Sequence, residues 1–84
     1  MAIMKVCSVY DFKAECYNQP FVVAALGIAV RDFTDAFSDD KRAKHRDDFA
    51  LWHVADFDNM SGSFESVVPP RMIIKGSDIL IEGK

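Results

Sequence analysis

The sequence predicts an α+β fold in which an antiparallel sheet of two hairpins carries one amphipathic helix on a face. Three observations predict it: two pairs of β-prone segments, one stretch with apolar residues at helical spacing, and turn residues between these segments. Apolar stripes on both the strands and the helix need mutual burial, and two layers are the smallest arrangement that provides it. The 84 residues are expected to form one domain.

The first hairpin is expected within residues 1–25. Residues 3–11 are rich in β-prone side chains such as Val6 and Val9, and residues 19–25 are centred on Phe21. The polar residues between these two segments are typical of a long connection.

The helix is expected over residues 27–39. Its apolar residues recur at spacings of three and four and form one stripe: Leu26, Ala29, Val30, Phe33 and Phe37. The start lacks a good N-cap residue, because Leu26 and Gly27 cannot accept the first backbone N–H groups with a side-chain oxygen.

The second hairpin is expected over residues 49–68, with a turn at residues 58–62 that is rich in Asp, Asn, Ser and Gly. The core is expected to contain these side chains: Val6, Phe21, Val23, Val30, Phe33, Phe37, Phe49, Leu51, Trp52, Phe57 and Phe64. The tail, residues 71–84, has two apolar runs around a turn signal at residues 76–78, which favours a terminal hairpin or added strands. An exposed strand edge in the tail would invite pairing with a second copy.

The bulk composition limits the classes of function. A net charge of -3 and a pI near 5.1 argue against a general polyanion binder, because non-specific nucleic-acid affinity comes mostly from Lys and Arg. A chain this small buries a limited core, so a homodimer or higher homo-oligomer is expected. No secretory signal is evident, and the longest apolar stretch, residues 21–30, is too short to span a bilayer. We therefore expect a cytoplasmic protein with reduced cysteines and no membrane partner.

The residues give no catalytic or metal-binding constellation, so no enzyme activity, no cofactor and no metal are expected. Asp56-Phe57-Asp58 is similar to the opening of a calcium loop, but Met60 and Ser61 stand where that loop needs an oxygen ligand and Gly. Cys7 and His53 with an Asp could be drawn as a triad. However, neither Cys7 nor Cys16 has a cationic neighbour in its motif, so inert thiols are expected.

Two groups of residues are candidates for nucleic-acid binding. Lys41, Arg42, Lys44 and Arg46 form the main basic cluster and would contact phosphates, although flanking aspartates also allow a simple solvated loop. Phe12 and Tyr17 would stack on bases, as exposed aromatics do when a protein holds single strands without sequence readout. The alternative is that these two aromatics anchor a loop.

Several short motifs occur in an order that resembles a known viral family. They are Ser8-Val9-Tyr10-Asp11, Gln19-Pro20-Phe21, Ala29-Val30-Arg31-Asp32-Phe33, His45-Arg46-Asp47-Asp48-Phe49 with Leu51, Phe57-Asp58, Gly62 with Phe64, and Pro69-Pro70. In this order, over residues 5–70, the sequence resembles the small nonstructural protein of gokushovirus-type microviruses, which are single-stranded DNA bacteriophages.

The resemblance implies a phage protein of the host cytoplasm that is not a virion component. It implies single-stranded DNA binding during genome replication, or during the switch to single-stranded genome synthesis and packaging. It transfers no catalytic or binding residue to this chain. The alternative is a protein-interaction module that engages a host replication factor or a phage assembly protein without direct DNA binding, which the net negative charge and the apolar tail favour.

Overall fold

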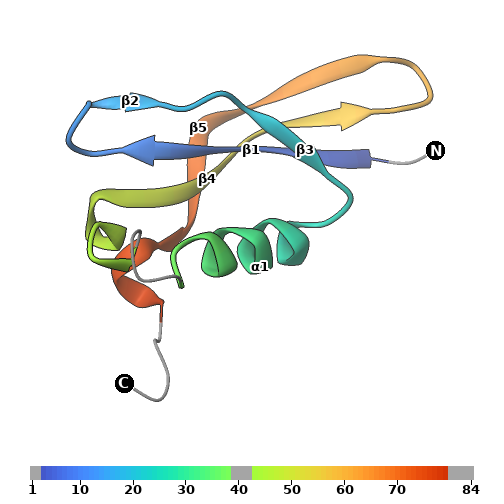
Figure 1. Cartoon of the computed structure of the whole chain (residues 1–84). Coiled ribbons are helices and arrows are strands. Elements are labelled where there is room, and N and C mark those ends of the chain that lie inside the picture. Colours follow the sequence, from blue (N-terminus) through green and yellow to red (C-terminus); the bar gives the residue numbers. More distant parts are fainter. Residues whose placement is uncertain (1–2, 39–42, 80–84) are drawn as a thin grey trace.

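The computed structural model describes residues 3–38 and 43–79 and has the predicted α+β class, with one α-helix on one face of a curled antiparallel sheet (Figure 1). The strands are β1 (Ile3–Asp11), β2 (Cys16–Tyr17), β3 (Phe21–Val23), β4 (Phe49–Asp58) and β5 (Ser63–Lys75). The α-helix is α1 (Leu26–Ala36), and two short 3-10 helices are η1 (Arg46–Asp48) and η2 (Gly76–Asp78).

β1 is the central strand of the sheet. β2 and β3 both pair with it on one side, β4 pairs with it on the other, and β5 lies outside β4. The first hairpin therefore forms as expected, and the polar connection contributes the short strand β2. Cys7 marks the centre, because it is in register with Phe21 on one side and His53 on the other.

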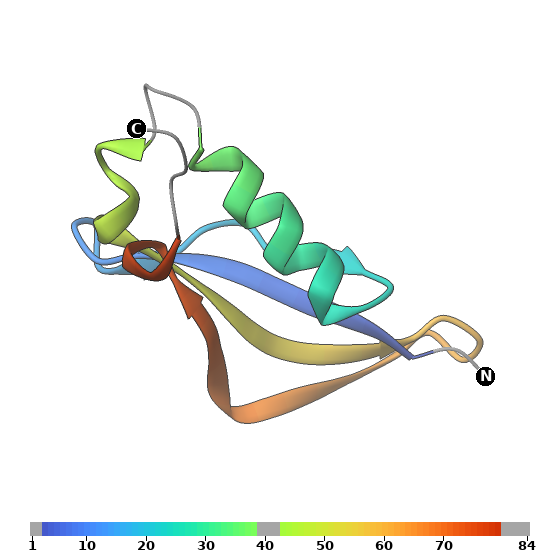
Figure 2. The same ribbon diagram turned by 90° about the horizontal axis from the view of Figure 1, so that it is seen from below.

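Irregular pairing makes the sheet curl. Val6 is in register with Ala55 and Cys7 with His53, so Val54 is an extra residue on β4, as in a β-bulge. Opposite the same point, Ser66 pairs with Ala55 and Arg71 with His53, which leaves residues 67–70 of β5 without a β4 partner. Figure 2 shows β5 swinging away from β4 there and returning. Two of the four unpaired residues are prolines, which have no N–H to donate to a ladder.

The core lies between α1 and the sheet face that it covers. It contains the buried residues Cys7, Ala29, Phe33, Phe37, Leu51 and Ile79. Phe37, whose ring centroid lies 4.9 Å from that of Phe33 and 5.0 Å from that of Phe49, joins the helix to the start of β4. Leu51 and Cys7 are fully buried. The helical stripe predicted from the sequence is therefore the stripe that packs.

Part of the expected core is wrong. Phe64 is 67% exposed, and Trp52 and Phe57 are half-buried, because all three lie on the face of the sheet that α1 does not cover. The helix also ends at Ala36, before the expected Asp39, with Phe37 as its C-cap residue.

The first part of the tail is built into the fold. Residues 71–75 complete β5, and Ile79 after η2 is buried in the core. Within residues 3–38 and 43–79, no helix is long and apolar enough to cross a membrane.

Candidate nucleic-acid interface

The two faces of the sheet differ in charge. The register places most charged strand residues on the α1 side, among them Lys5, Asp11, Asp56, Asp58, Glu65 and Arg71. The opposite face, here called the open face, carries one charged strand residue among those that the structure describes, Lys75, which pairs with Ala50 beside Tyr10. The open face is otherwise apolar, aromatic or hydroxylic, and such an uncovered surface is typical of a binding face.

Four aromatic side chains form a continuous row at one end of this face. Phe12 packs on Tyr10 (centroids 5.1 Å apart), Tyr10 on Tyr17 (4.8 Å) and Tyr17 on Trp52 (6.1 Å), each edge to face. We call these residues the aromatic row. Phe12 is 44% exposed and Tyr17 42% exposed, so both offer ring surface to a ligand.

The aromatic row combines predicted and missed residues. Phe12 and Tyr17 were candidates from the sequence, and the structure brings them together through Tyr10. Trp52 was assigned to the core, and Lys75 was not considered as a ligand-binding residue. In β1, Val6, Ser8 and Tyr10 alternate with Cys7 and Val9, so the sequence indicates that these two sets lie on opposite faces of the sheet. This signal does not identify Trp52 or Lys75, which lie on other strands.

The basic cluster lies at the same end of the sheet. The backbone N–H of Phe12 donates to the carbonyl of Asp48 (2.8 Å), which ties the β1–β2 turn to η1. Lys44 is exposed, whereas Arg46 is half-buried and its Nη1 donates to the carbonyl of Ala43 (3.2 Å). Lys41 and Arg42 lie outside the described residues. The guanidinium of Arg46 is therefore engaged with the backbone of its own turn. Of Lys44 and Arg46, the exposed Lys44 is the more accessible to a phosphate group.

The other cations divide into two groups. Lys5 pairs with Asp56 (3.4 Å) and Arg31 with Asp32 (3.9 Å). Arg71, on the α1 side of the sheet, forms no ion pair with any residue in the described ranges. The same holds for Lys13 and Lys75. They join Lys44 and Arg46 at the end that holds the aromatic row, but acidic residues lie at this end too: Asp11, Glu15, Asp47, Asp48 and Asp78. The field there is mixed, so electrostatic attraction of a polyanion is weak and local.

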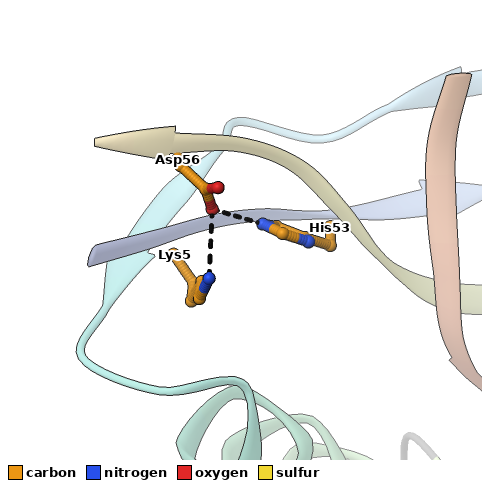
Figure 3. A network of polar contacts seen from close by, with 3 residues as sticks. All are labelled: Lys5, His53 and Asp56. Atoms are coloured by element: carbon orange, nitrogen blue, oxygen red, sulfur yellow. Dashed lines mark hydrogen bonds and ion pairs between the residues drawn. The ribbon is translucent and has the colours of Figure 1, made fainter. Parts of the chain in front are cut away.

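A polar network lies on the α1 side of the sheet, beside the β4 bulge, and consists of His53, Asp56 and Lys5 (Figure 3). Nε2 of His53 donates to Oδ1 of Asp56 (2.8 Å), and Nζ of Lys5 lies 3.4 Å from the same oxygen. The His53 hydrogen bond, reinforced by Lys5, lowers the pKa of Asp56. His53 is nine-tenths buried, and its Nδ1 has no partner among the residues described. The extra residue Val54 brings His53 and Asp56 to one face, which the sequence alone does not reveal.

Cys7 is directly opposite His53 in register, and His53 is hydrogen-bonded to Asp56. The residues of the possible catalytic triad considered in the sequence analysis are therefore neighbours in the structure. However, Cys7 is fully buried, and this burial raises the pKa of its thiol. A neutral, inaccessible thiol is a poor nucleophile. Cys16 is exposed on β2 and is in register with Asp11, whereas Cys7 is in register with Phe21 and His53. The two cysteines are therefore not cross-strand neighbours, and both are free thiols.

The fold is that of a small α+β protein with one sheet face that α1 does not cover. Comparison with family models identifies the group: the model described as "Phage ORF5 protein" matches residues 4–79, and the chain belongs to this family. It is therefore a phage protein. Comparisons with curated proteins and with solved structures gave no match.

Proposed function

We propose that this phage protein is a non-enzymatic accessory protein that binds single-stranded DNA through the aromatic row on its open face. In an infected host cytoplasm it would support genome replication, or the switch to single-stranded genome synthesis and packaging, outside the virion. The proposal extends the resemblance to gokushovirus-type microviruses, and one observation carries it: four linked aromatic rings on an uncovered sheet face.

Stacking provides most of the affinity in this proposal. Every base has an apolar π-face, and stacking on a protein aromatic contributes about 1–3 kcal/mol per base whatever the sequence. Duplex DNA cannot use this surface, because its bases are already stacked on one another. The row therefore favours single strands over duplexes.

Phosphate contacts add a smaller part. Lys75 lies on the open face next to the row, and Lys13 follows Phe12 in the β1–β2 turn. Each phosphate neutralised on a single strand contributes about -0.7 to the slope of log K against log salt. With so few cations at the row, we expect a shallow salt dependence.

Fluorescence anisotropy with a labelled oligothymidylate tests the proposal. Tyr17→Ala and Phe12→Ala are each expected to weaken binding by about 5- to 150-fold, which corresponds to the loss of one stacked base. Trp52 is the single tryptophan of the chain, so quenching of its emission on DNA addition reports stacking at the row directly.

Phe64→Ala is the matched control. Phe64 is a more exposed aromatic on the same face, but it packs on Phe57 (4.8 Å) near the β4–β5 turn, away from the row. Its removal should leave DNA affinity unchanged. Absence of binding to any single-stranded oligonucleotide at low salt would refute the proposal, and an equal loss in the Phe64 variant would refute the assignment to the row.

A protein-interaction module without DNA binding is the second candidate, and the far half of the open face favours it. Phe64 and Val22 are exposed there without a charged strand neighbour on that half of the face. A second copy, a host replication factor or a phage assembly protein could cover this surface. Loss of self-association or of a partner in Phe64→Ala, with no DNA binding in the parent protein, would establish this function instead.

A further inference from the structure

A cavity of about 580 Å³ opens on the α1 side of the sheet, at the end that carries the aromatic row. Val9, Phe37 and Phe49 line it as apolar walls. The polar lining residues are Asp11, Lys13, Asn18, His45 and Asp48. The volume is in the range of pockets that hold small organic ligands. The β1–β2 turn contributes to both surfaces, because Lys13 lines the cavity and the neighbouring Phe12 packs on Tyr10 of the aromatic row.

The apolar walls suit a flat aromatic ligand. The rings of Phe37 and Phe49 lie 5.0 Å apart with an interplanar angle of 35°, and both residues pack against the main core. Because these rings are held by the core, they are already positioned before a ligand arrives. Preorganised apolar surface loses little entropy on binding.

The Asp11 carboxylate at the cavity is already used, because it accepts the backbone N–H groups of Lys13 (2.9 Å) and Ala14 (3.1 Å). Lys13, Asn18 and Asp48, in contrast, have side chains that remain available. Asn18 is held by its N–H to the carbonyl of Val9 (2.8 Å) and by its carbonyl, which accepts from the hydroxyl of Ser8 (2.6 Å). Asp48 is held by the Phe12 hydrogen bond. The side chains of Lys13, Asn18 and Asp48 make no hydrogen bond to another residue within 3–38 or 43–79. A small number of convergent polar groups over an apolar wall is typical of a specific pocket.

We propose that this cavity receives one guanine base of the bound strand, turned around the Phe12–Lys13 corner from the open face. The inference rests on the proposed function and adds a base preference to it. Guanine presents two adjacent donors on its free edge, N1–H and N2–H, and two parallel N–H groups match a carboxylate such as that of Asp48. Adenine, cytosine and thymine each place an acceptor beside their donor, which an aspartate repels. Lys13 and His45, also at the cavity, face the phosphate.

Deoxyguanosine monophosphate is the probe, because it tests the cavity without the row. In amide-resolved NMR titrations it is expected to shift the resonances of Asn18 and Asp48, whereas thymidine monophosphate should bind at least about tenfold more weakly. Asp48→Asn should abolish this difference. Asp47→Asn is the control, since Asp47 is the exposed neighbour that does not line the cavity.

The outcomes separate the two proposals. Tyr17→Ala should weaken oligothymidylate binding and leave the titration with deoxyguanosine monophosphate unchanged. Asp48→Asn should remove the preference for deoxyguanosine monophosphate and leave oligothymidylate binding unchanged. The absence of localised shifts with the guanine nucleotide, or equal effects of the Asp47 and Asp48 variants, would overturn the guanine pocket while the row could still bind DNA. Native-like amide spectra of each variant show that it is folded.

Discussion

The contact between η1 and η2 predicts opposite effects for the same substitution at two glycines. A Cβ added at Gly76 would lie 1.7 Å from the carbonyl oxygen of Arg46 and 2.6 Å from its carbonyl carbon. Both atoms belong to the backbone, so no side chain can rotate away. Real Cβ contacts essentially never fall below 3.0 Å. The backbones of η1 and η2 must therefore separate by about 1.3 Å, the difference between 3.0 Å and 1.7 Å. Gly27, in contrast, has no atom of the residues that the structure describes within 4 Å of its added Cβ.

Overpacking of this kind costs about 1–3 kcal/mol or more, and the backbone origin of the clash puts Gly76→Ala near the upper value. For a domain of this size about 3 kcal/mol lowers Tm by about 12–24 °C. Gly27→Ala lies in α1 and should instead stabilise the protein by about 0.5 kcal/mol, because alanine loses less backbone entropy in a helix.

Urea denaturation followed by Trp52 emission measures both effects. The midpoint should fall in the Gly76 variant and rise slightly in the Gly27 variant, with similar slopes. Equal midpoints for the two variants would refute the close packing of η2 on η1, and with it the way in which Lys75 is brought to the end of the open face.

Three further predictions follow from burial and charge. Because the pKa of Asp56 is lowered from 3.8, its contribution to stability is present above that value and is lost as the pH falls through the folded-state pKa; the Tm advantage over Asp56→Asn should therefore shrink below about pH 4. An aromatic disulfide reagent should modify the exposed thiol of Cys16 in the native protein and that of Cys7 only after denaturation, and rapid native reaction of both would contradict the packing. Leu51→Ala should cost about 2.7–5 kcal/mol, a large part of the stability of so small a domain, and a well-resolved native circular dichroism melt near that of the parent would argue against its burial.

The sequence predicts the elements that depend on local periodicity. The spacing of Ala29, Phe33 and Phe37 identifies both the helix and the face that it buries, and the Asp-Asn-Ser-Gly turn identifies the second hairpin. The helix ends three residues early because Phe37 leaves helical geometry (φ -104, ψ 13) and packs in the core beside Phe49. That is a tertiary preference and leaves no local signal.

The sheet face could not be predicted with the same success. Strands β1 and β4 are apolar on both faces, so alternation does not say which face one short helix will cover, and Trp52 and Phe64 were placed in the core for this reason. The sequence predicts that the second hairpin ends at residue 68, directly before Pro69 and Pro70. Strand β5 instead continues to Lys75, because both prolines fall in the stretch that has no β4 partner.

The candidate site shows the same division. Phe12 and Tyr17 could be selected because aromatic residues in a polar connection are conspicuous in the sequence. Lys75 could not, since its place on the open face depends on where the register of β5 resumes after residues 67–70. The pairing of His53 with Asp56 likewise depends on one extra residue in β4.

The break in the pairing of β5 has a consequence for the outer edge of the sheet. A thirteen-residue border strand is a natural template for fibril growth. Here two consecutive imino acids stand in the middle of that border, and each lacks the amide hydrogen that a newcomer would need. Addition of a further strand is thereby interrupted halfway along this edge, so the two prolines oppose the growth of a continuous cross-β stack.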